Sequence, residues 1–448
     1  MANQKPLYYL FIFFSILSYV AIGYLIQRHE TIYLLPAFAL LFLIYGWIIK
    51  QQDNSHEFWI VVAILFRLIF LFALPSLSDD FYRFIWDGRL WSAGYHPFAE
   101  LPSTYVQQGI EGIDQQLFSK LNSPEYFTIY PPVSQFIYWL SVKVSPHSVL
   151  GSVIFMRALL IVTEAGSILL MRNLLKRFAL PSKNVLIYAL NPLVVVELVG
   201  NLHFEALIIF FVLLTVYFLD TQKWIKSTLA MALAIGSKLI PLLFLPALVR
   251  LLEIKKAIRY GLIVTLGLVV LFIPIYNSRV ISGMSESLGL YFNKFEFNAS
   301  LYYLVREYGF WHYGYNIIQT VGWKLGAIAG VLILLFSFRK GLKWNLVVDI
   351  KANQKLLSEW MWVLCIYFLF ATIVHPWYIT TLLALSIFTS YRFVVLWTGL
   401  IFLTYTGYTV SGFSEIMWLT ACEYILVVGY LVFELITHFR TRKSEYNG

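Results

Sequence analysis

The chain alternates between long apolar runs and short polar connections. A helix of about 20 apolar residues is long enough to cross the roughly 30 Å hydrocarbon core of a bilayer. Apolar runs predict membrane spans near residues 7–26, 31–49, 58–75, 148–171, 184–200, 204–219, 260–276, 315–338, 356–374, 377–390, 394–411 and 416–437. The pattern therefore predicts an all-α polytopic membrane protein, a bundle of about 12–14 transmembrane helices that forms a single transmembrane domain over residues 1–448.

Two apolar stretches depart from this pattern. The run 227–252 is interrupted between Gly236 and Pro241, which favours two short half-helices or a re-entrant hairpin over one straight span. The stretch Val133–Val144 follows Tyr130-Pro131-Pro132 and is too short for a span. We expect it to form a helix on the outer membrane interface, with one of these prolines in its first turn.

The composition excludes a soluble domain. Hydrophobic residues make up 60% of the sequence and charged residues only 13%, and the mean hydropathy is +0.73. A soluble domain of this composition would have far more apolar surface than it could bury. The lipid bilayer is therefore an expected partner. Cys365 and Cys422 lie inside apolar runs and are expected to be packing residues.

The basic residues predict the orientation. The formal net charge is +9, but most Lys and Arg lie in short clusters between apolar runs, so no nucleic-acid partner is expected. The clusters fall in alternate connections, which by the positive-inside rule places the N- and C-termini in the cytoplasm. We expect a multi-pass protein of the plasma (inner) membrane with two long outer (periplasmic or extracytoplasmic) segments, 76–147 and 277–314. The active site is expected on that outer side.

The most informative polar motif opens the first outer segment. The sequence from Ser78 predicts a helix that is N-capped by Ser78 and has Asp79 and Asp80 in its first turn. At the outer membrane boundary one of these carboxylates could act as a general base toward a hydroxyl, and Arg83 and Arg89 could hold an anionic group such as a lipid phosphate. A structural alternative has about equal weight: the acids stabilise the helix N-terminus, and Asp79 pairs with Arg83.

A second polar cluster ends the fifth predicted span. Glu197 and Asn201 are four residues apart and share a helix face, after a kink expected at Pro192. His203 and Glu205 follow at the outward turn. An ionisable residue at this depth usually faces a cavity, although these residues could also cap the turn or pair with each other.

Two further candidates come later in the chain. Lys238 lies at the break within 227–252, where it would either meet a phosphate or pair with a buried acid such as Glu197. The motif His375-Pro376-Trp377-Tyr378 falls at an outward turn, where its aromatic residues also suit the membrane interface without any further role.

Several other chemistries lack a motif. The sequence has no Gly-rich phosphate loop, no His-x-x-x-His zinc pair and no nucleophilic serine in a recognisable setting, so soluble nucleotide and metalloprotease chemistry are not expected. No cofactor is expected either. A divalent cation at Asp79 and Asp80 has no motif to support it.

Taken in order, the motifs resemble those of GT-C glycosyltransferases, particularly polyprenol-phosphate-mannose-dependent mannosyltransferases and their bacterial relatives. The resemblance rests on Asp79-Asp80, Arg83 to Arg89, Gly94 to Phe98, Tyr130-Pro131-Pro132, Asn191-Pro192, Gly200 to Glu205, Lys238 to Pro241 and His375 to Tyr378. It extends over most of the chain. The two acids are adjacent, whereas some members space them by one residue, so the resemblance does not say which acid is the base.

The resemblance implies a GT-C-like bundle and a transferase that moves a hexose, mannose favoured, from a polyprenyl-phosphate sugar to a glycan or glycolipid hydroxyl on the outer face, with inversion. Asp79 or Asp80 would be the catalytic base. A lipid-phosphate leaving group can be stabilised by Arg or Lys. The implied substrate-binding residues are Arg83, Asp87, Arg89, Tyr130, Glu197, Asn201, His203, Glu205, Lys238 and His375.

Two other functions are compatible with the sequence. A transporter or flippase of lipid-linked sugars would also use broken helices and polar residues inside spans, but it predicts symmetry-related broken segments in the two halves, and only 227–252 is a clear case. A membrane-embedded ligase or polymerase of lipid-linked glycans would place Arg and His, more than an acidic pair, at the outer loop.

Overall fold

The computed structural model describes residues 5–51, 55–252, 254–339 and 350–447. Within these residues the regular secondary structure is helical apart from one short hairpin and one isolated bridge. The hairpin consists of β1 (Tyr408–Thr409) and β2 (Gly412–Phe413). Six of the described helices are long and apolar enough to cross a membrane, and a bent pair of helices adds a seventh candidate. The predicted all-α polytopic fold is confirmed.

The candidate spans account for only part of the predicted bundle. They are Pro6–Leu25, Thr31–Lys50, Val149–Arg177, Ile254–Ile275, Ile318–Phe338 and Met417–Arg440. The helices that supply these spans are α1 (Lys5–Val20) with the π-helical turn η2 (Ala21–Leu25), α2 (Thr31–Lys50), α8 (Val149–Arg177), α14 (Ile254–Phe272) with η6 (Ile273–Ile275), α17 (Ile318–Phe338) and α21 (Met417–Asn447).

Shorter or less apolar helices occupy the other predicted spans. They are α3 (His56–Leu68), α11 (Glu205–Asp220), α18 (Ile350–Phe370), α19 (Tyr378–Ser386), and α20 (Phe393–Leu400) with η7 (Ile401–Gly407). The run 58–75 therefore does not continue as a helix to its predicted end, because α3 stops at Leu68. The number of 12–14 crossings depends on these shorter helices and stays a prediction.

The kink predicted at Pro192 is present and divides the fifth predicted span. On one side are η3 (Ser182–Asn184) and α9 (Val185–Ala189), and on the other are α10 (Pro192–Val194) and the π-helix η4 (Val195–Gly200). The helix axis bends by 51° between the two halves. Asn191 Oδ1 accepts a hydrogen bond from the Leu193 backbone N–H at 3.0 Å, and Pro192 has no N–H to donate, so these residues start a new helix.

The interrupted run 227–252 forms two helical pieces, as one form of the prediction requires. α12 (Trp224–Ser237) stops just before Lys238, whose backbone is extended, with φ −162° and ψ 148°. The chain then continues as η5 (Ile240–Phe244) and α13 (Leu245–Leu251). The hydroxyl of Ser134 donates a hydrogen bond to the Ser237 carbonyl at 2.9 Å, which satisfies one acceptor at the end of α12.

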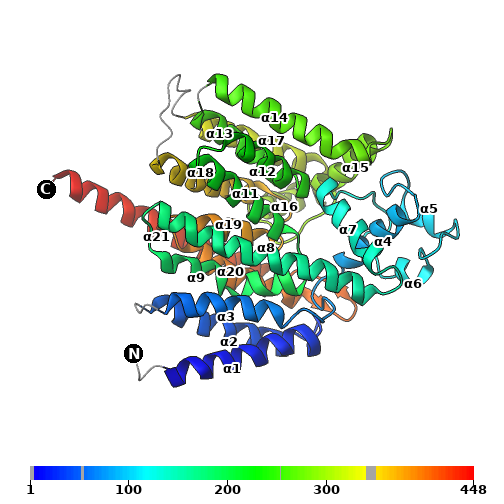
Figure 1. Ribbon diagram of the computed structural model, residues 1–448, viewed down its shortest axis with the longest axis horizontal. Helices are drawn as coiled ribbons and strands as arrows, with labels where there is room; N and C mark the ends of the chain where they lie inside the picture. The colour runs from blue at the N-terminus through cyan, green and yellow to red at the C-terminus, as the bar shows by residue number, and fades with distance from the viewer. Residues whose placement is uncertain (1–4, 52–54, 253, 340–349, 448) are drawn as a thin grey trace.

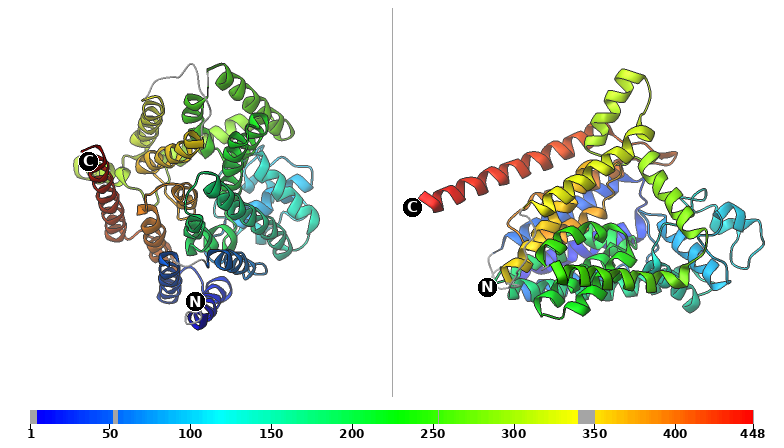
Figure 2. Two further views of the ribbon diagram at one scale, coloured as in Figure 1. Left: turned by 60° about the vertical axis from the view of Figure 1, so that its left-hand side comes forward. Right: turned by 90° about the horizontal axis from the view of Figure 1, so that it is seen from above.

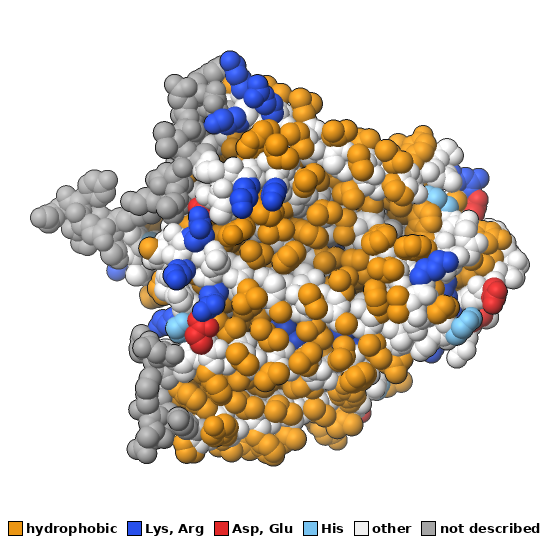
Figure 3. Space-filling view, viewed as in Figure 1, with side chains coloured by type: hydrophobic (Ala, Val, Ile, Leu, Met, Phe, Trp, Pro, Cys, Tyr) orange, Lys and Arg blue, Asp and Glu red, His pale blue; other side chains and the backbone are white. Residues whose placement is uncertain are grey.

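The bundle has two distinct ends. α1 begins and α21 ends at the left-hand end in Figure 1, whereas α4 to α7 form a cap at the opposite end. Figure 3 shows a broad apolar band between the ends, and most of the visible Lys and Arg side chains lie at the end where α1 begins. Which end faces the cytoplasm stays a prediction.

The two segments predicted to face outward contain helices joined by loops and turns. The first contains α4 (Asp80–Ser92), α5 (Pro102–Val106), α6 (Gln115–Phe118) and α7 (Pro132–Val144), and α7 has Pro132 in its first turn as predicted. The second contains α15 (Val280–Asn293) and α16 (Leu301–Tyr313). In the right-hand view of Figure 2, α16 projects sideways from the bundle. The position of α7 on the membrane interface stays a prediction.

A glycine holds α4 close to α7. A Cβ atom at Gly88 would lie 2.4 Å from the backbone oxygen of Tyr138. We therefore expect Gly88→Ala to push the two helices apart and to lower the free energy of unfolding by about 1–3 kcal/mol. Thermal unfolding of the purified protein in detergent measures this change. The control is Gly46→Ala on α2, where a Cβ meets no atom within 4 Å; equal stability of the two variants would contradict the packing argument.

Candidate functional site

The turn that follows η4 gathers several predicted residues. Glu197 is fully buried, and its carboxylate accepts hydrogen bonds from the Tyr405 hydroxyl at 2.7 Å and from Asn201 Nδ2 at 3.1 Å. Asn201 Oδ1 accepts a hydrogen bond from the Leu77 backbone N–H at 3.3 Å. The predicted proximity of Glu197 and Asn201 is confirmed, and the pair joins this turn to the residues just before Asp79.

A buried arginine of α8 fixes the same turn. Arg157 is fully buried, and its guanidinium donates to backbone carbonyls instead of a carboxylate. Nε donates to the Val199 oxygen at 2.8 Å and Nη2 to the Gly200 oxygen at 2.9 Å. Nη1 donates to the carbonyls of Leu71, at 3.4 Å, and Ala73. One side chain therefore holds the end of η4 and the connection from α3 to α4 in register.

The acidic pair stands at the start of α4, with different partners for its two members. Asp79 Oδ2 lies 2.5 Å from Arg28 Nη1, and both side chains are 35% exposed. Asp80 Oδ1 accepts a hydrogen bond from Asn122 Nδ2 at 2.6 Å. The predicted pairing of Asp79 with Arg83 is wrong. So is the predicted N-cap, since Asp79 occupies that position, although Ser78 Oγ accepts a hydrogen bond from the Asp80 backbone N–H at 3.3 Å.

Arg28 is a site residue that the sequence analysis missed. It lies in the short turn between η2 and α2, and its guanidinium also sits 5.0 Å from the centre of the Tyr408 ring. Arg28 thus connects the acidic pair to the β1–β2 hairpin. A signal was present, because a basic residue in a turn predicted to face outward runs against the positive-inside rule.

Arg83 and Asp87 fold the first outer segment onto α4. Both are buried, and Arg83 Nε lies 3.0 Å from Asp87 Oδ1. Asp87 Oδ2 also accepts hydrogen bonds from Thr128 Oγ1 at 2.5 Å and Gln135 Nε2 at 2.8 Å. Arg83 Nη1 donates to two backbone carbonyls within 123–126. This geometry favours a positioning role, and direct contact of these two residues with substrate stays a prediction.

Arg89 and Tyr130 also contact the protein itself. Arg89 Nη1 donates a hydrogen bond to the Gly112 backbone oxygen at 2.7 Å, and burial lowers the pKa of Arg89. The Tyr130 ring packs edge-on against Phe84 and Tyr138, with ring centres 5.1 Å and 5.5 Å apart. Arg89 is therefore placed away from the acidic pair as a support of the outer loop, whereas Tyr130 packs next to the start of α7.

Two histidines predicted from separate motifs come together around one tryptophan. The Trp377 ring lies between His203, at 3.7 Å, and His375, at 4.3 Å between ring centres, and is nearly parallel to both. His203 Nε2 is 3.4 Å from Glu197 Oε2 but makes no hydrogen bond, and His375 Nδ1 is also buried without one. Burial, together with Lys238 and His203, holds the pKa of His375 well below its usual range, so its imidazole is neutral. Buried unpaired ring nitrogens are suited to the hydroxyls of a sugar.

Lys238 lies beside these histidines. Its ammonium forms an ion pair with Glu205, and it sits 4.4 Å from the centre of the Tyr378 ring. The prediction that Lys238 pairs with a buried acid is thus correct in kind, but the partner is Glu205 and not Glu197. The Lys238 side chain is 30% exposed, whereas that of Glu205 is 3% exposed. Lys238 is therefore the more exposed member of the pair.

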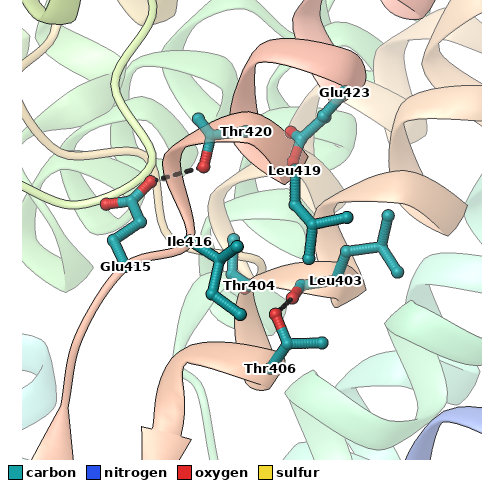
Figure 4. A pocket seen from close by; sticks show the side chains of 8 residues that line it. All are labelled: Leu403, Thr404, Thr406, Glu415, Ile416, Leu419, Thr420 and Glu423. Carbon is teal, nitrogen blue, oxygen red and sulfur yellow. Dashed lines mark hydrogen bonds between the residues drawn. The ribbon is translucent and has the colours of Figure 1, made fainter.

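A separate polar cluster around Glu415 and Glu423 connects the segment 277–314 to α21 and to the residues just before it. The Asn298 backbone N–H donates to Glu415 at 3.1 Å, and Asn298 Nδ2 donates to Glu423 at 3.1 Å. Trp397 Nε1 also donates to Glu423, at 2.8 Å. Figure 4 shows the small pocket beside these acids, in which Glu415 accepts a hydrogen bond from Thr420 at 2.6 Å. These hydrogen bonds connect α20, α21 and the loops that contain Asn298 and Glu415 to one another, so we assign this cluster a structural role.

Within the part of the chain that the structure describes, no group of three or more His, Cys, Asp or Glu side chains is arranged to hold a metal ion. Asp79 and Asp80 are instead engaged by Arg28 and Asn122. That the reaction needs no cofactor stays a prediction.

Comparison with protein families gives the N-terminal domain of the alpha-(1->6)-mannopyranosyltransferase family, whose model matches residues 16–253. The matched region covers more than half of the chain and contains Arg28, the acidic pair, Glu197 and Lys238. His375 lies outside it. Neither curated proteins nor solved structures give a match.

Proposed function

Because the chain belongs to the alpha-(1->6)-mannopyranosyltransferase family, and is therefore a membrane-bound mannosyltransferase, we propose that its donor is a polyprenyl-phosphate mannose. The acceptor in this proposal is a glycan or glycolipid on the outer face of the plasma membrane. The family name points to an α-(1→6) bond, so the attacking oxygen is a primary sugar hydroxyl. Inversion at the anomeric carbon then requires a donor with a β-linked phosphate.

The observation that carries the proposal is the meeting of two sets of groups around one turn. The turn after η4 bonds through Asn201 to the segment that presents Asp79 and Asp80. The same turn presents His203 to Trp377, and Glu205 to Lys238. A base and a phosphate-binding cation thus lie on neighbouring elements at one end of the bundle, as transfer from a lipid phosphate requires.

The proposed step is a single displacement. One carboxylate of the acidic pair takes the proton of the acceptor hydroxyl while its oxygen bonds to the anomeric carbon of mannose. The bond from that carbon to the phosphate oxygen breaks, and its electron pair stays on the phosphate. Lys238 stabilises the negative charge that develops there. His203 and His375 hold hydroxyls of the transferred sugar.

The alternative functions lose their basis once the family is known. A transporter or flippase would explain the broken helix at Lys238 equally well, but it forms no bond, whereas a mannosyltransferase family predicts bond chemistry. A ligase or polymerase of lipid-linked glycans transfers a whole glycan, whereas the family name specifies transfer of mannose. No described feature favours one of these alternatives specifically.

The test is a transfer assay with purified protein. The donors are synthetic polyprenyl-phosphate mannoses with the phosphate in the β or the α configuration, and the acceptor is a membrane glycolipid with terminal mannose. We expect transfer from the β donor alone and an α-(1→6) product by methylation analysis. Transfer from a sugar nucleotide, with no transfer from either lipid donor, would overturn the proposal.

A further inference from the structure

The β1–β2 hairpin extends the candidate site on the side of the acidic pair. Tyr408 of β1 pairs with Phe413 of β2, and the centres of their rings lie 4.8 Å apart. The centre of the Tyr408 ring also lies 5.0 Å from the guanidinium of Arg28, which forms an ion pair with Asp79. The hairpin therefore borders the acidic pair, although it lies outside the residues that the family model matches.

An unbroken row of rings continues from the hairpin to the histidines. Phe413 stacks on Phe297, with 5.0 Å between ring centres and 23° between ring planes. The Phe297 ring lies 4.5 Å from His375, which stacks on Trp377. The Phe297 backbone N–H donates to the Thr372 oxygen at 3.0 Å, which fixes Phe297 beside His375. We call this set the aromatic row; its members are Tyr408, Phe413, Phe297, His375 and Trp377.

Phe413 is the most exposed ring of the aromatic row. It is 39% exposed, whereas Phe297 is 8% exposed. Two exposed hydroxyl residues stand on the same hairpin: Thr409 Oγ1 donates to the Gly412 oxygen at 2.9 Å and lies 3.0 Å from Ser411 Oγ. An accessible aromatic face with hydroxyls close by suits a pyranose, which has apolar C–H groups on a face of its ring and hydroxyls around the edge.

The two ends of the aromatic row differ in their charged neighbours. Tyr408, at one end, contacts the arginine that pairs with Asp79, so this end lies where the acceptor hydroxyl loses its proton. Trp377, at the other end, packs against Tyr378, and the Lys238 ammonium lies over the Tyr378 ring. The hairpin therefore lies on the side of the acceptor, and the leaving phosphate belongs to the opposite end.

We propose that the hairpin is the acceptor subsite: the mannose ring that carries the attacking hydroxyl stacks on Phe413, and Thr409 and Ser411 bond its other hydroxyls. The inference rests on the proposed function and deepens it, because it assigns residues to recognition of the acceptor. Phe297 and Tyr408 hold the Phe413 ring in place from two sides, so the ring offers a fixed surface to the sugar.

The test separates acceptor affinity from donor affinity. Phe413→Leu keeps an apolar side chain but removes the flat ring. We expect the KM for a mannose-terminated acceptor to rise about tenfold, the loss of one stacking contact, with kcat and the KM for the lipid donor unchanged. Phe413→Trp keeps a flat ring and is expected to retain most of the acceptor affinity. Phe433→Leu on α21 is the matched control, because it makes the same change at a side chain that is 62% exposed, and both KM values should stay at wild type.

A second measurement does not depend on turnover. Saturation-transfer difference NMR of the wild type with α-(1→6)-mannobiose is expected to show the strongest saturation on the C–H protons of one ring face. Phe413→Leu should lose this pattern, and Phe433→Leu should keep it.

Three outcomes would overturn the hairpin assignment while transfer by the wild type leaves the proposed function intact. They are an equal rise of both KM values in Phe413→Leu, wild-type KM values in that variant, as expected if Phe413 only contacts lipid, and an unchanged saturation pattern. Absence of any transfer by the wild type would instead count against the proposed function, and the NMR comparison would still decide the hairpin assignment.

Discussion

Asparagine in place of Asp79 or Asp80 is expected to lower the rate of mannosyl transfer by about 10²–10⁴-fold at the position that supplies the base. An amide cannot accept the hydroxyl proton, but it keeps the size of the carboxylate and most of its hydrogen bonds. The two acids differ in their partners, since Asp79 meets Arg28 and Asp80 meets Asn122. We therefore expect unequal effects of the two substitutions. The measurement is single-turnover transfer, with the acceptor at a concentration below that of the enzyme and the donor saturating.

Folding and donor binding must be controlled separately. Thermal unfolding and the binding of donor lipid should change little for the variant that loses the base, because the amide keeps the shape of the side chain. At Asp79 the substitution also removes the charge that pairs with the half-buried Arg28, whose contribution to stability is small. If neither Asp79→Asn nor Asp80→Asn slows transfer by more than about tenfold, the base lies elsewhere and the acidic pair is structural.

Glutamine at Lys238 is expected to have the second largest effect, a fall in kcat of about 10²–10³-fold. The neutral amide still donates a hydrogen bond to phosphate, but it lacks the charge that stabilises the leaving group. The fall should be larger for donors with a poor leaving group than for an activated phosphodiester of mannose. Steady-state kinetics with both donor types measures the difference.

Two further variants separate chemistry from stability at this position. Glu205 is almost fully buried, so Lys238→Gln leaves a buried carboxylate without its cation, which destabilises the fold. Adding Glu205→Gln should restore the unfolding temperature and leave kcat low. Lys226→Gln, at an exposed position of α12, the helix that ends just before Lys238, is the control for loss of a positive charge. Full activity in the double variant would show that Lys238 only balances Glu205.

The sequence predicts most of the elements that build the site, because local rules determine them. Pro192 kinks the fifth predicted span, Pro132 begins a helix, and the residues around Lys238 break one, and all three features are present. Helix ends are less predictable. The apolar run 58–75 continues past the point where α3 stops at Leu68. Residues 69–72 form turns, and the carbonyls of Leu71 and Ala73 accept hydrogen bonds from Arg157.

Contacts between distant segments were beyond the reach of sequence patterns. The spacing of Asp79 and Arg83 suits an ion pair within one helix, but Arg28, fifty-one positions before Asp79, takes that place. Likewise Lys238 pairs with Glu205 because the turn after η4 brings this acid nearer than Glu197. Trp377 was part of a motif, yet only the fold reveals that two histidines from different motifs stack on its faces. Such pairings depend on how helices pack, which helical periodicity does not specify.

Arg157 imposes an order on the biosynthesis of the protein. A lone arginine at the centre of a span costs about 2.5–3.5 kcal/mol during insertion. Arg157 lies in the N-terminal third of the 29-residue α8 and carries part of this cost until its guanidinium is paired. The carbonyls that accept its hydrogen bonds belong to residues 71–73, which are synthesised before α8, and to residues 199–200, which are synthesised after it. We therefore expect α8 to reach its final position only after the chain up to Gly200 has been synthesised and its carbonyls have closed around the guanidinium.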